Sequence, residues 1–309
     1  MSGCYAVFHK QLGDLVLLQP ALGKLAERHG GDVQLLTRNG HEPLVEIMPR
    51  VKMQRGLALT PRHALYCYDP LNKSAFRSLA IPVLKRTCIL PERRELAWYH
   101  RFLFGEIIVP ELGDRYVAEY FWSLTPPASS EAFPRPRLNQ PPDTWMPAWH
   151  DGSPYILVNP TAGWKRKSWQ ADQWATCLDA LADVCTERFI LTSGQDAWQM
   201  AHCAKIIRKS KRKERLMMAP GTSLREFLWL CANAGAVLTV DGAAAHLAAA
   251  FSVPSLAIFG PTSLLNWHLV GPQTKAVQAP VAEDDIRHLK NLKAEPVLEA
   301  CRALFASRE

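Results

Sequence analysis

Three loops of the sequence hold residues that could do chemistry, and the first is Q-L-G-D, from Gln11 to Asp14. The Asp14 carboxylate lies at the start of a predicted helix, where exposed backbone N–H groups favour its ionised form. Asp14 is therefore either a general base or a residue that caps the helix. The capping role alone would account for Asp14, because Asp is common at helix N-termini.

The second loop, N-P-T-A-G-W-K-R-K-S-W from Asn159 to Trp169, places Thr161 and three consecutive cations (165–167) before a predicted helix. A helix N-terminus with lysines beside it is a place where phosphate binds, through both the helix dipole and the charge. The loop is not a P-loop, because G-x-x-x-x-G-K-[ST] is absent. An ordinary basic loop is the alternative.

The third loop lies within 237–251, where a predicted strand leads to Asp241 and Gly242 and then to a helix of small residues that carries His246. The glycine and the alanines after it let a ligand approach the backbone and the helix N-terminus closely. Alternatively, His246 is a histidine of the core. G-P-T at 260–262 ends the next strand and is predicted to line the same cleft. No Ser/His/Asp order, paired carboxylates or metal-ligand cluster is recognisable, so we expect no metal.

Strands that alternate with helices must position these loops. Residues 5–8, 15–28 and 33–36 read as strand, helix and strand, a βαβ unit that indicates a parallel α/β architecture. The pattern is weaker up to residue 125, where we expect strands at 65–68 and 107–109 and helices at 95–104 and 116–124. Further on we expect strands at 155–158, 188–191, 236–239 and 255–259, and helices at 171–184, 198–207, 224–234 and 246–251. Ligands of such doubly wound sheets bind beyond the carboxyl ends of the strands.

The length of 309 residues predicts two domains. A Pro-rich polar segment, 126–154, is the predicted linker between them. With 48% apolar and 21% charged residues, the composition excludes a disordered, collagen-like or coiled-coil chain. Eight widely spaced cysteines without a C-x-x-C pair predict reduced core thiols. We find neither a secretory signal nor a clean apolar stretch of about 18 residues, so we expect a cytoplasmic protein.

The net charge of +7 is concentrated in one segment. Residues 205–215 (KIIRKSKRKER) hold seven basic side chains and one acidic, so that this segment carries +6 and the rest of the chain +1. A polybasic stretch can attract anionic lipid head groups or the phosphates of nucleic acid. A solvated helix end and loop is the alternative.

Six motifs follow one another over most of residues 5–272: L-G-D-L-V-L-L-Q-P-A-L (Leu12–Leu22), the second loop, L-T-S-G (Leu191–Gly194), V-D-G-A-A-A-H (Val240–His246), F-G-P-T (Phe259–Thr262) and N-W (Asn266–Trp267). Together they resemble glycosyltransferase family 9, the bacterial ADP-heptose:lipopolysaccharide heptosyltransferases, and most closely its heptosyltransferase III branch. The resemblance implies a GT-B fold, in which two doubly wound Rossmann-like domains face a central cleft. It implies an acceptor-binding domain at 1–145 and a nucleotide-sugar-binding domain at 155–290, with a C-terminal helix, 296–309, packed back on the first domain.

The resemblance also implies roles for single residues. Asp14 matches the general base that deprotonates an acceptor hydroxyl, and Lys167 matches the lysine that contacts the donor diphosphate. Thr161 matches a phosphate-side threonine, and Asp241 and His246 match the donor-site Asp and His. The other expected donor-binding residues are Gly194, Asp196, Thr222, Gly242, Gly260 and Thr262.

The sequence departs from the family at two places. Gly242 stands where the family usually has Ser or Thr, so one hydroxyl donor to the phosphate or sugar is missing. The Pro-Gly-Thr-Ser-Leu loop, 220–224, lacks its usual basic residue, which leaves the recognition of adenine open. The remaining pattern fits the chemistry, because a diphosphate leaving group needs cationic and N–H stabilisation in place of a metal, and the attacking alcohol needs a carboxylate base.

The leading hypothesis is an inverting transferase that moves heptose from ADP-heptose to the inner core of lipopolysaccharide, without a cofactor. It would work at the cytoplasmic face of the inner membrane, where 205–215 would contact anionic lipid. A second hypothesis keeps the enzyme but changes the acceptor to a protein side chain or another glycan. A third is a catalytically silent module that binds a sugar nucleotide or nucleic acid, and nucleic acid is the less favoured partner.

Overall fold

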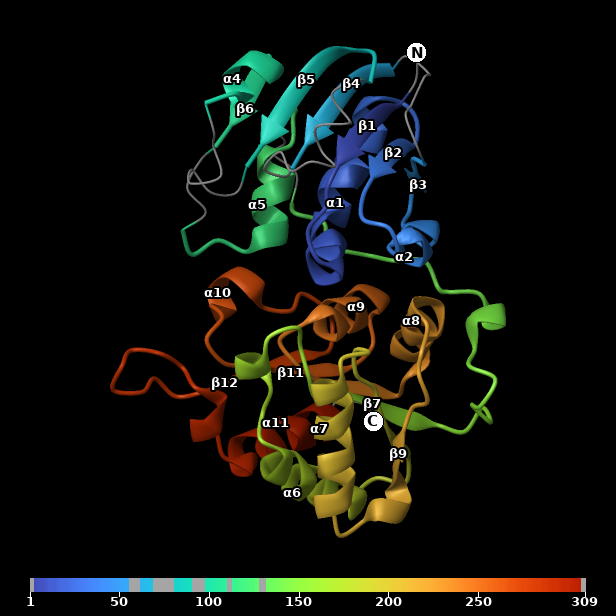
Figure 1. The fold of residues 1–309 in the computed structure, drawn as a ribbon, viewed down its shortest axis with the longest axis vertical. Coiled ribbons are helices and arrows are strands. Elements are labelled where there is room, and N and C mark those ends of the chain that lie inside the picture. The colour runs from blue at the N-terminus through green and yellow to red at the C-terminus, as the bar shows by residue number, and fades with distance from the viewer. Residues whose placement is uncertain are drawn as a thin grey trace. The chain divides into compact units, whose positions relative to one another are not determined.

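The computed structural model describes residues 3–55, 62–68, 81–90, 98–109, 113–127 and 132–306. The chain divides into two compact units, Met1–Asn139 and Gln140–Glu309. Each unit is built on one six-stranded sheet in which all strand pairs are parallel, with helices between the strands (Figure 1). The two doubly wound sheets that the sequence predicts are confirmed.

The sheet of the first unit has the strand order β3-β2-β1-β4-β5-β6. Its strands are β1 (Cys4–Val7), β2 (Val33–Leu36), β3 (Val51–Met53), β4 (Arg62–Cys67), β5 (Val83–Ile89) and β6 (Glu106–Ile108), and its helices are α1 (Leu12–Arg28), α2 (Glu42–Glu46), α4 (His100–Leu103) and α5 (Val117–Leu124). The order reverses between β1 and β4, so the segment that follows β1 lies at the topological switch point.

Helix α1 follows β1 at that switch point. Its apolar residues face both the sheet and α5, and the two helices lie side by side in Figure 1. Phe121 of α5 makes edge-to-face contacts with Phe8 and Tyr68, at ring-centroid distances of 6.3 and 5.8 Å. This packing fixes the start of α1, which carries Asp14, relative to the first sheet.

The second unit repeats the same topology, with the order β12-β11-β10-β7-β8-β9. Its strands are β7 (Tyr155–Asn159), β8 (Arg188–Leu191), β9 (Leu216–Met218), β10 (Ala236–Val240), β11 (Ser255–Phe259) and β12 (Thr274–Gln278). Its α-helices are α6 (Ala171–Ala182), α7 (Ala197–Lys209), α8 (Leu224–Asn233), α9 (Ala243–Phe251), α10 (Leu264–Trp267) and α11 (Ala294–Ala306). Here the order reverses between β7 and β10, which are hydrogen-bonded neighbours.

The C-terminal helix, α11, takes part in the core of the second unit. Val297, Leu298, Cys301 and Leu304 are buried there, where the helix packs against α6, β11 and β12. The contact of 296–309 with the first domain stays a prediction. Residues 307–309 lie outside the described part of the chain.

Most of the strands and helices predicted for the second unit are present within a few residues of their expected ends. Four strands, β3, β5, β9 and β12, were not predicted, and α9 begins at Ala243 rather than at 246. In the first unit, residues 95–97 of the helix expected at 95–104 lie outside the described residues. All eight cysteines lie in the described residues and none is in a disulfide, and seven of them are buried, as expected for core thiols. In the described segments no helix is both long and apolar enough to cross a membrane.

Candidate functional site

Two residues of the second unit meet where its strand order reverses. Lys167 follows β7 and Asp241 follows β10, and the Lys167 ammonium donates to the Asp241 carboxylate, with Nζ 2.6 Å from Oδ2. The Asp241 side chain is 6% exposed and the Lys167 side chain 20%. The ion pair therefore lies at the sheet edge where a doubly wound fold binds its ligand, with part of the ammonium open to solvent.

The local chain geometry holds Lys167 in this place. Residues Lys165–Lys167 form one turn of 3-10 helix, closed by hydrogen bonds from the Lys167 N–H to the Trp164 carbonyl and from the Ser168 N–H to the Lys165 carbonyl, both 2.9 Å. Trp169, two residues after Lys167, is fully buried, and its indole N–H donates to the Leu292 carbonyl at 3.0 Å. A turn with a buried anchor directly behind it keeps the lysine beside Asp241.

The other two cations of this loop rest on aromatic rings. The Arg166 guanidinium lies 4.8 Å from the centroid of Trp164, and the Lys165 ammonium lies 5.7 Å from that of Trp198. Among the described residues, neither cation forms an ion pair with a carboxylate. The loop carries three positive charges against the one negative charge of Asp241, so its surface attracts anions.

His246 lies in α9, one turn beyond the helix start, and is only 5% exposed. Burial lowers the pKa of its imidazole to about 4, and the cations Lys167 and His268 act in the same direction, while Asp241 opposes them. The ring is therefore neutral at pH 7. A neutral imidazole can still donate one hydrogen bond without adding charge to the site.

Gly242 occupies the N-cap of α9 with extended backbone angles that any residue can adopt. A Cβ added there would meet the Ala162 Cβ at 3.7 Å and the Val240 carbonyl oxygen at 3.8 Å, which are ordinary contacts. Packing does not require glycine at this position. The backbone N–H groups in the first turn of α9 point out of the helix start, where an anion can bind.

Thr161, Gly194 and Asp196 are brought together by Gln199, a residue that sequence reasoning missed. Its side-chain Oε1 accepts hydrogen bonds from the Gly194 N–H at 2.6 Å and the Thr161 hydroxyl at 3.2 Å, and its Nε2 donates to Asp196 Oδ2 at 3.4 Å. Gln199 lies in the first turn of α7, directly after the S-G-Q-D loop. This position, in the first helical turn after a candidate donor loop, was the only feature of the sequence that could have indicated Gln199.

Three of the expected donor-binding residues, Thr222, Gly260 and Thr262, have other surroundings than this cluster in the described structure. Thr222 is half-buried in the loop before α8. Gly260 is required by packing, because an added Cβ would lie 2.8 Å from the Leu289 side chain. The Thr262 carbonyl accepts a hydrogen bond from the Gln278 amide at 3.4 Å. Their role in binding stays a prediction.

Asp14 belongs to the first unit, at the switch point of that sheet. Its carboxylate Oδ2 accepts a hydrogen bond from the Gln11 N–H at 3.1 Å, as part of a capping box at the start of α1. The side chain is half-buried. The helix cap that the sequence left open is thus present.

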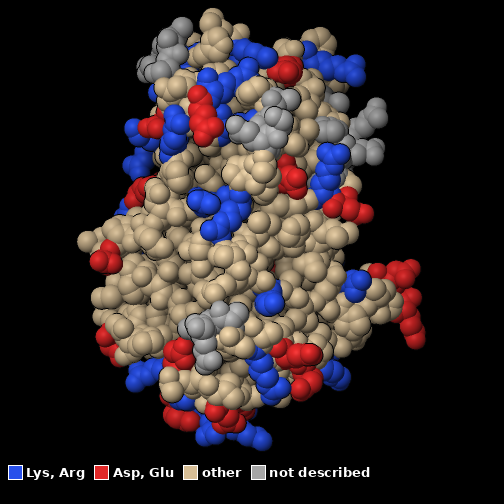
Figure 2. Space-filling model, turned by 180° about the vertical axis from the view of Figure 1, so that it is seen from behind, with Lys and Arg blue, Asp and Glu red and all other residues tan. Residues whose placement is uncertain are grey.

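The polybasic segment is partly used within the second unit. The Arg215 guanidinium donates to the carbonyls of Cys185 and Glu187, both at 2.7 Å, and Lys209 and Arg212 pair with Asp172 and Asp183. Within 205–215, all of which the structure describes, the exposed cations whose side chains form no ion pair with a carboxylate are Lys205, Arg208, Lys211 and Lys213. On the face that Figure 2 draws, Asp and Glu are interspersed with Lys and Arg, so no continuous basic surface appears there.

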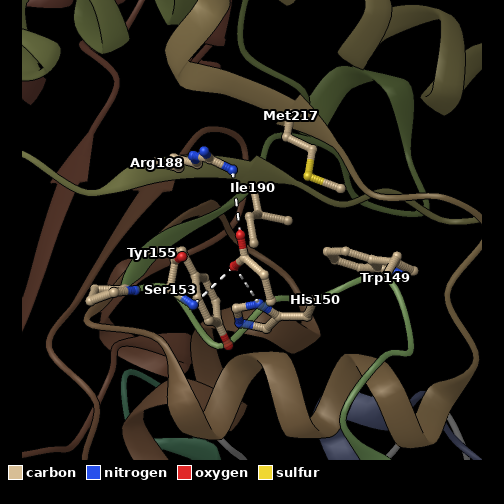
Figure 3. Close-up of a pocket in the computed structure, with 9 residues that line it drawn as sticks. Trp149, His150, Ser153, Tyr155, Arg188, Ile190 and Met217 are labelled. Atoms are coloured by element: carbon tan, nitrogen blue, oxygen red, sulfur yellow. Dashed lines mark hydrogen bonds and ion pairs between the residues drawn. The ribbon is translucent and has the colours of Figure 1, made fainter.

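A pocket of about 320 Å³, part of it open to solvent, lies at the amino ends of β7 and β8 (Figure 3). It is lined by Trp149, His150, Asp151, Tyr155, Arg188 and Met217, among others. The Asp151 carboxylate accepts from the Ser153 N–H at 3.0 Å and lies 3.8 Å from the Arg188 guanidinium. None of the predicted site residues lines this pocket, because they follow the carboxyl ends of the strands.

Known proteins resemble this chain in both sequence and fold. The lipopolysaccharide heptosyltransferase 3 of Escherichia coli is 27% identical over 166 residues, which cover 52% of this chain and 48% of that protein. The chain therefore spans about half the length of this relative. The structure titled E. coli ADP-heptose lps heptosyltransferase II superposes with a TM-score of 0.82 at 19% identity, over 100% of this chain and 99% of that one. A glycosyltransferase family 9 structure from Veillonella parvula gives 0.81 at 13%, over 99% and 97%.

The fold of those structures is the GT-B fold that the resemblance implies, and the match extends over the whole chain. Residues 118–296, more than half of the sequence, match the profile of glycosyltransferase family 9 (heptosyltransferase). The chain belongs to glycosyltransferase family 9.

Proposed function

We propose that this protein is an inverting glycosyltransferase that transfers heptose from ADP-heptose to the inner core of lipopolysaccharide. The observation that carries the proposal is the Lys167–Asp241 pair at the switch point of the second sheet, in a chain of the heptosyltransferase family. Two solved relatives, titled E. coli heptosyltransferase WaaC with ADP and with ADP-2-deoxy-2-fluoro heptose, support the choice of donor.

The second unit supplies the groups that a nucleoside diphosphate needs. The Lys167 ammonium has three N–H donors, of which one is donated to Asp241, and it lies 5.3 Å from the centroid of the Trp164 ring. It can therefore also donate to a phosphate oxygen. Lys165 and Arg166 add positive charge beside it, and the first turn of α9 adds N–H donors. These groups would stabilise the negative charge that develops on the ADP leaving group.

In the proposed reaction the Asp14 carboxylate takes the proton of an acceptor hydroxyl, and that oxygen attacks the anomeric carbon of the donor. The bond between this carbon and the phosphate oxygen breaks, and its electron pair leaves with ADP. A single displacement of this kind inverts the anomeric configuration. The hydrogen bond from the Gln11 N–H orients the Asp14 carboxylate at the start of α1.

Contact with an anionic membrane surface is a further part of the proposal. Lys205, Arg208, Lys211 and Lys213 support it, since each Lys or Arg near such a surface contributes about 1 kcal/mol. Reversing these four charges is expected to lower binding to phosphatidylglycerol vesicles at physiological salt. If the variant bound the vesicles as tightly as the wild type, residues 205–215 would have no part in membrane contact.

The proposal is tested by calorimetry with ADP and by mass spectrometry of heptose-deficient lipopolysaccharide incubated with ADP-heptose and the enzyme. We expect ADP binding and a mass gain of one heptose. Binding of ADP without transfer to this acceptor would favour another glycan or a protein as acceptor. Salt-dependent binding to DNA without binding of ADP would favour the silent module.

A further inference from the structure

Gln199 is a buried amide that belongs to no motif and joins two loops of the candidate donor site. It is 6% exposed and lies in the first turn of α7. Its Oε1 accepts from the Gly194 N–H (2.6 Å) and the Thr161 hydroxyl (3.2 Å), while its Nε2 donates to Asp196 Oδ2 (3.4 Å) and lies 3.5 Å from the Ala162 carbonyl oxygen. Both lone pairs and both hydrogens of the amide are therefore occupied.

These contacts connect places that are far apart in the sequence. Thr161 and Ala162 lie in the loop after β7, whereas Gly194 and Asp196 lie in the loop after β8. Ala162 in turn lies next to the N-cap of α9, since a Cβ added at Gly242 would meet its side chain at 3.7 Å. The Gln199 amide thus links the loops after the neighbouring strands β7 and β8. It also contacts Ala162, the residue that lies next to the start of α9.

The Gln199 amide leaves no room for a side chain at residue 194, so its position requires glycine there. A Cβ added at Gly194 would lie 2.5 Å from Gln199 Oε1 and 3.1 Å from its Cδ, closer than side chains approach one another. Thr161 is 3% exposed, and its hydroxyl donates its hydrogen to Gln199 Oε1. Neither the Gly194 N–H nor the Thr161 proton is therefore directed at a ligand, and both serve the shape of the loops.

We infer that Gln199 is a positioning residue of the donor site, whose side-chain amide holds the loops after β7 and β8 in the arrangement that binds the nucleoside diphosphate. This inference rests on the proposed function. Removal of the amide leaves buried polar groups of both loops without partners, which favours other loop conformations. The loss is then expected in the affinity for the donor rather than in the chemical step.

The test compares ADP binding and donor kinetics of the full-length wild type with the variants Gln199→Met and Gln199→Glu. Gln199→Met has a similar shape and removes all four hydrogen bonds. We expect its dissociation constant for ADP and its KM for ADP-heptose to rise about tenfold, which corresponds to the loss of one or two net hydrogen bonds, with kcat changed by less than about threefold. Asn233→Leu is the matched control, since it removes an amide that donates to the Trp229 carbonyl at the end of α8.

Gln199→Glu supplies a readout that a purely structural role would not change. The new carboxylate keeps two acceptor oxygens but repels Asp196, and at low pH its protonated form regains one donor. The ratio of variant to wild-type dissociation constants for ADP should therefore fall as the pH is lowered from 8 to 5.5. This variant decides the question if Gln199→Met does not fold.

The outcomes separate the two claims. A wild-type protein that does not bind ADP contradicts the proposed function. A wild-type protein that binds ADP, with Gln199→Met binding it equally well or with a pH-independent ratio for Gln199→Glu, overturns the positioning role. A rise in KM for Asn233→Leu equal to that for Gln199→Met would also overturn it.

Discussion

Lys167 and Asp241 are 74 residues apart in the sequence, and their side chains are joined by a 2.6 Å ion pair where the strand order of the second sheet reverses. The pair places a partly open ammonium at the carboxyl ends of β7 and β10. Asp241 compensates the charge of the lysine in the absence of a ligand and orients it. In the proposed reaction the donor diphosphate would meet a cation already held in position, so that little reorganisation would be needed at the moment of reaction.

Lys167→Met should reduce transfer strongly, because it removes the cation closest to the switch point. We expect kcat/KM to fall by a factor of about 10² to 10³, the size of effect seen when a single group that stabilises developing charge is removed. Lys165→Met should cost less than Lys167→Met, since Lys165 only adds positive charge beside the site and its ammonium rests on the Trp198 ring. Steady-state kinetics with ADP-heptose would contradict the assignment if both variants lost activity equally.

Asp14→Asn separates the two roles of Asp14. The amide oxygen of the variant can still accept the Gln11 N–H, so the melting temperature should change little. The base is lost, and we expect kcat to fall by about 10² to 10⁴-fold. The matched control is Glu226→Gln, which alters the equivalent residue of the capping box at Ser223 in α8. An unchanged kcat for Asp14→Asn would leave Asp14 with its structural role alone.

His246 should make stability depend on pH. Burial lowers the pKa of its imidazole to about 4, below the unfolded value of 6.5, so the unfolded chain takes up a proton first as the pH falls. The contribution of the neutral ring is therefore fully present above pH 6.5 and is lost between pH 6.5 and 4. The full loss corresponds to about 3 kcal/mol of unfolding free energy.

Urea denaturation of the wild type and of His246→Gln, measured from pH 8 to pH 4, checks this behaviour. The difference in unfolding free energy between the two proteins should be constant above pH 6.5 and should shift in favour of the variant at lower pH. A difference that does not change with pH would mean that the histidine titrates normally in the folded state.

The sequence predicted those parts of the fold that rest on local patterns. The run of β1, α1 and β2 was readable, because an apolar strand, an amphipathic helix and a glycine stop follow one another. Strands such as β5 (VLKRTCI) and β12 (TKAVQ) were missed, since exposed charged residues interrupt their apolar pattern. The sheet partners of these strands hold them in extended form, and no window of sequence contains that information.

In the candidate site, too, residues with a local sequence pattern were predicted and a residue defined by distant contacts was not. Lys167, Asp241 and Gly242 were found because they follow strands and carry charge or lack a side chain. Gln199 was missed because its contacts reach 38 residues along the chain to Thr161, and a glutamine in a helix has no distinguishing pattern. Residues of the C-terminal helix are buried in the core of the second unit, and the contact with the first domain that the resemblance implies stays a prediction.

Gly242→Ser should supply at the start of α9 the hydroxyl that the family resemblance leads us to expect there. The backbone angles of Gly242 suit any residue, and an added Cβ finds only ordinary contacts at 3.7 and 3.8 Å. The serine can cap the helix or donate a hydrogen bond to a phosphate oxygen. We expect unchanged or slightly higher stability and a three- to tenfold tighter binding of ADP, which is about the net value of one hydrogen bond.

Gly260→Ser is the contrasting variant for this experiment. Its Cβ would lie 2.8 Å from the Leu289 side chain, so we expect a loss of about 1–3 kcal/mol in unfolding free energy from overpacking. Thermal unfolding and calorimetric titration with ADP, carried out on both variants, distinguish a missing ligand contact from a packing requirement. If Gly242→Ser weakened ADP binding while leaving stability intact, the close approach of a ligand to the bare backbone, rather than the lost hydroxyl, would explain the glycine at this position.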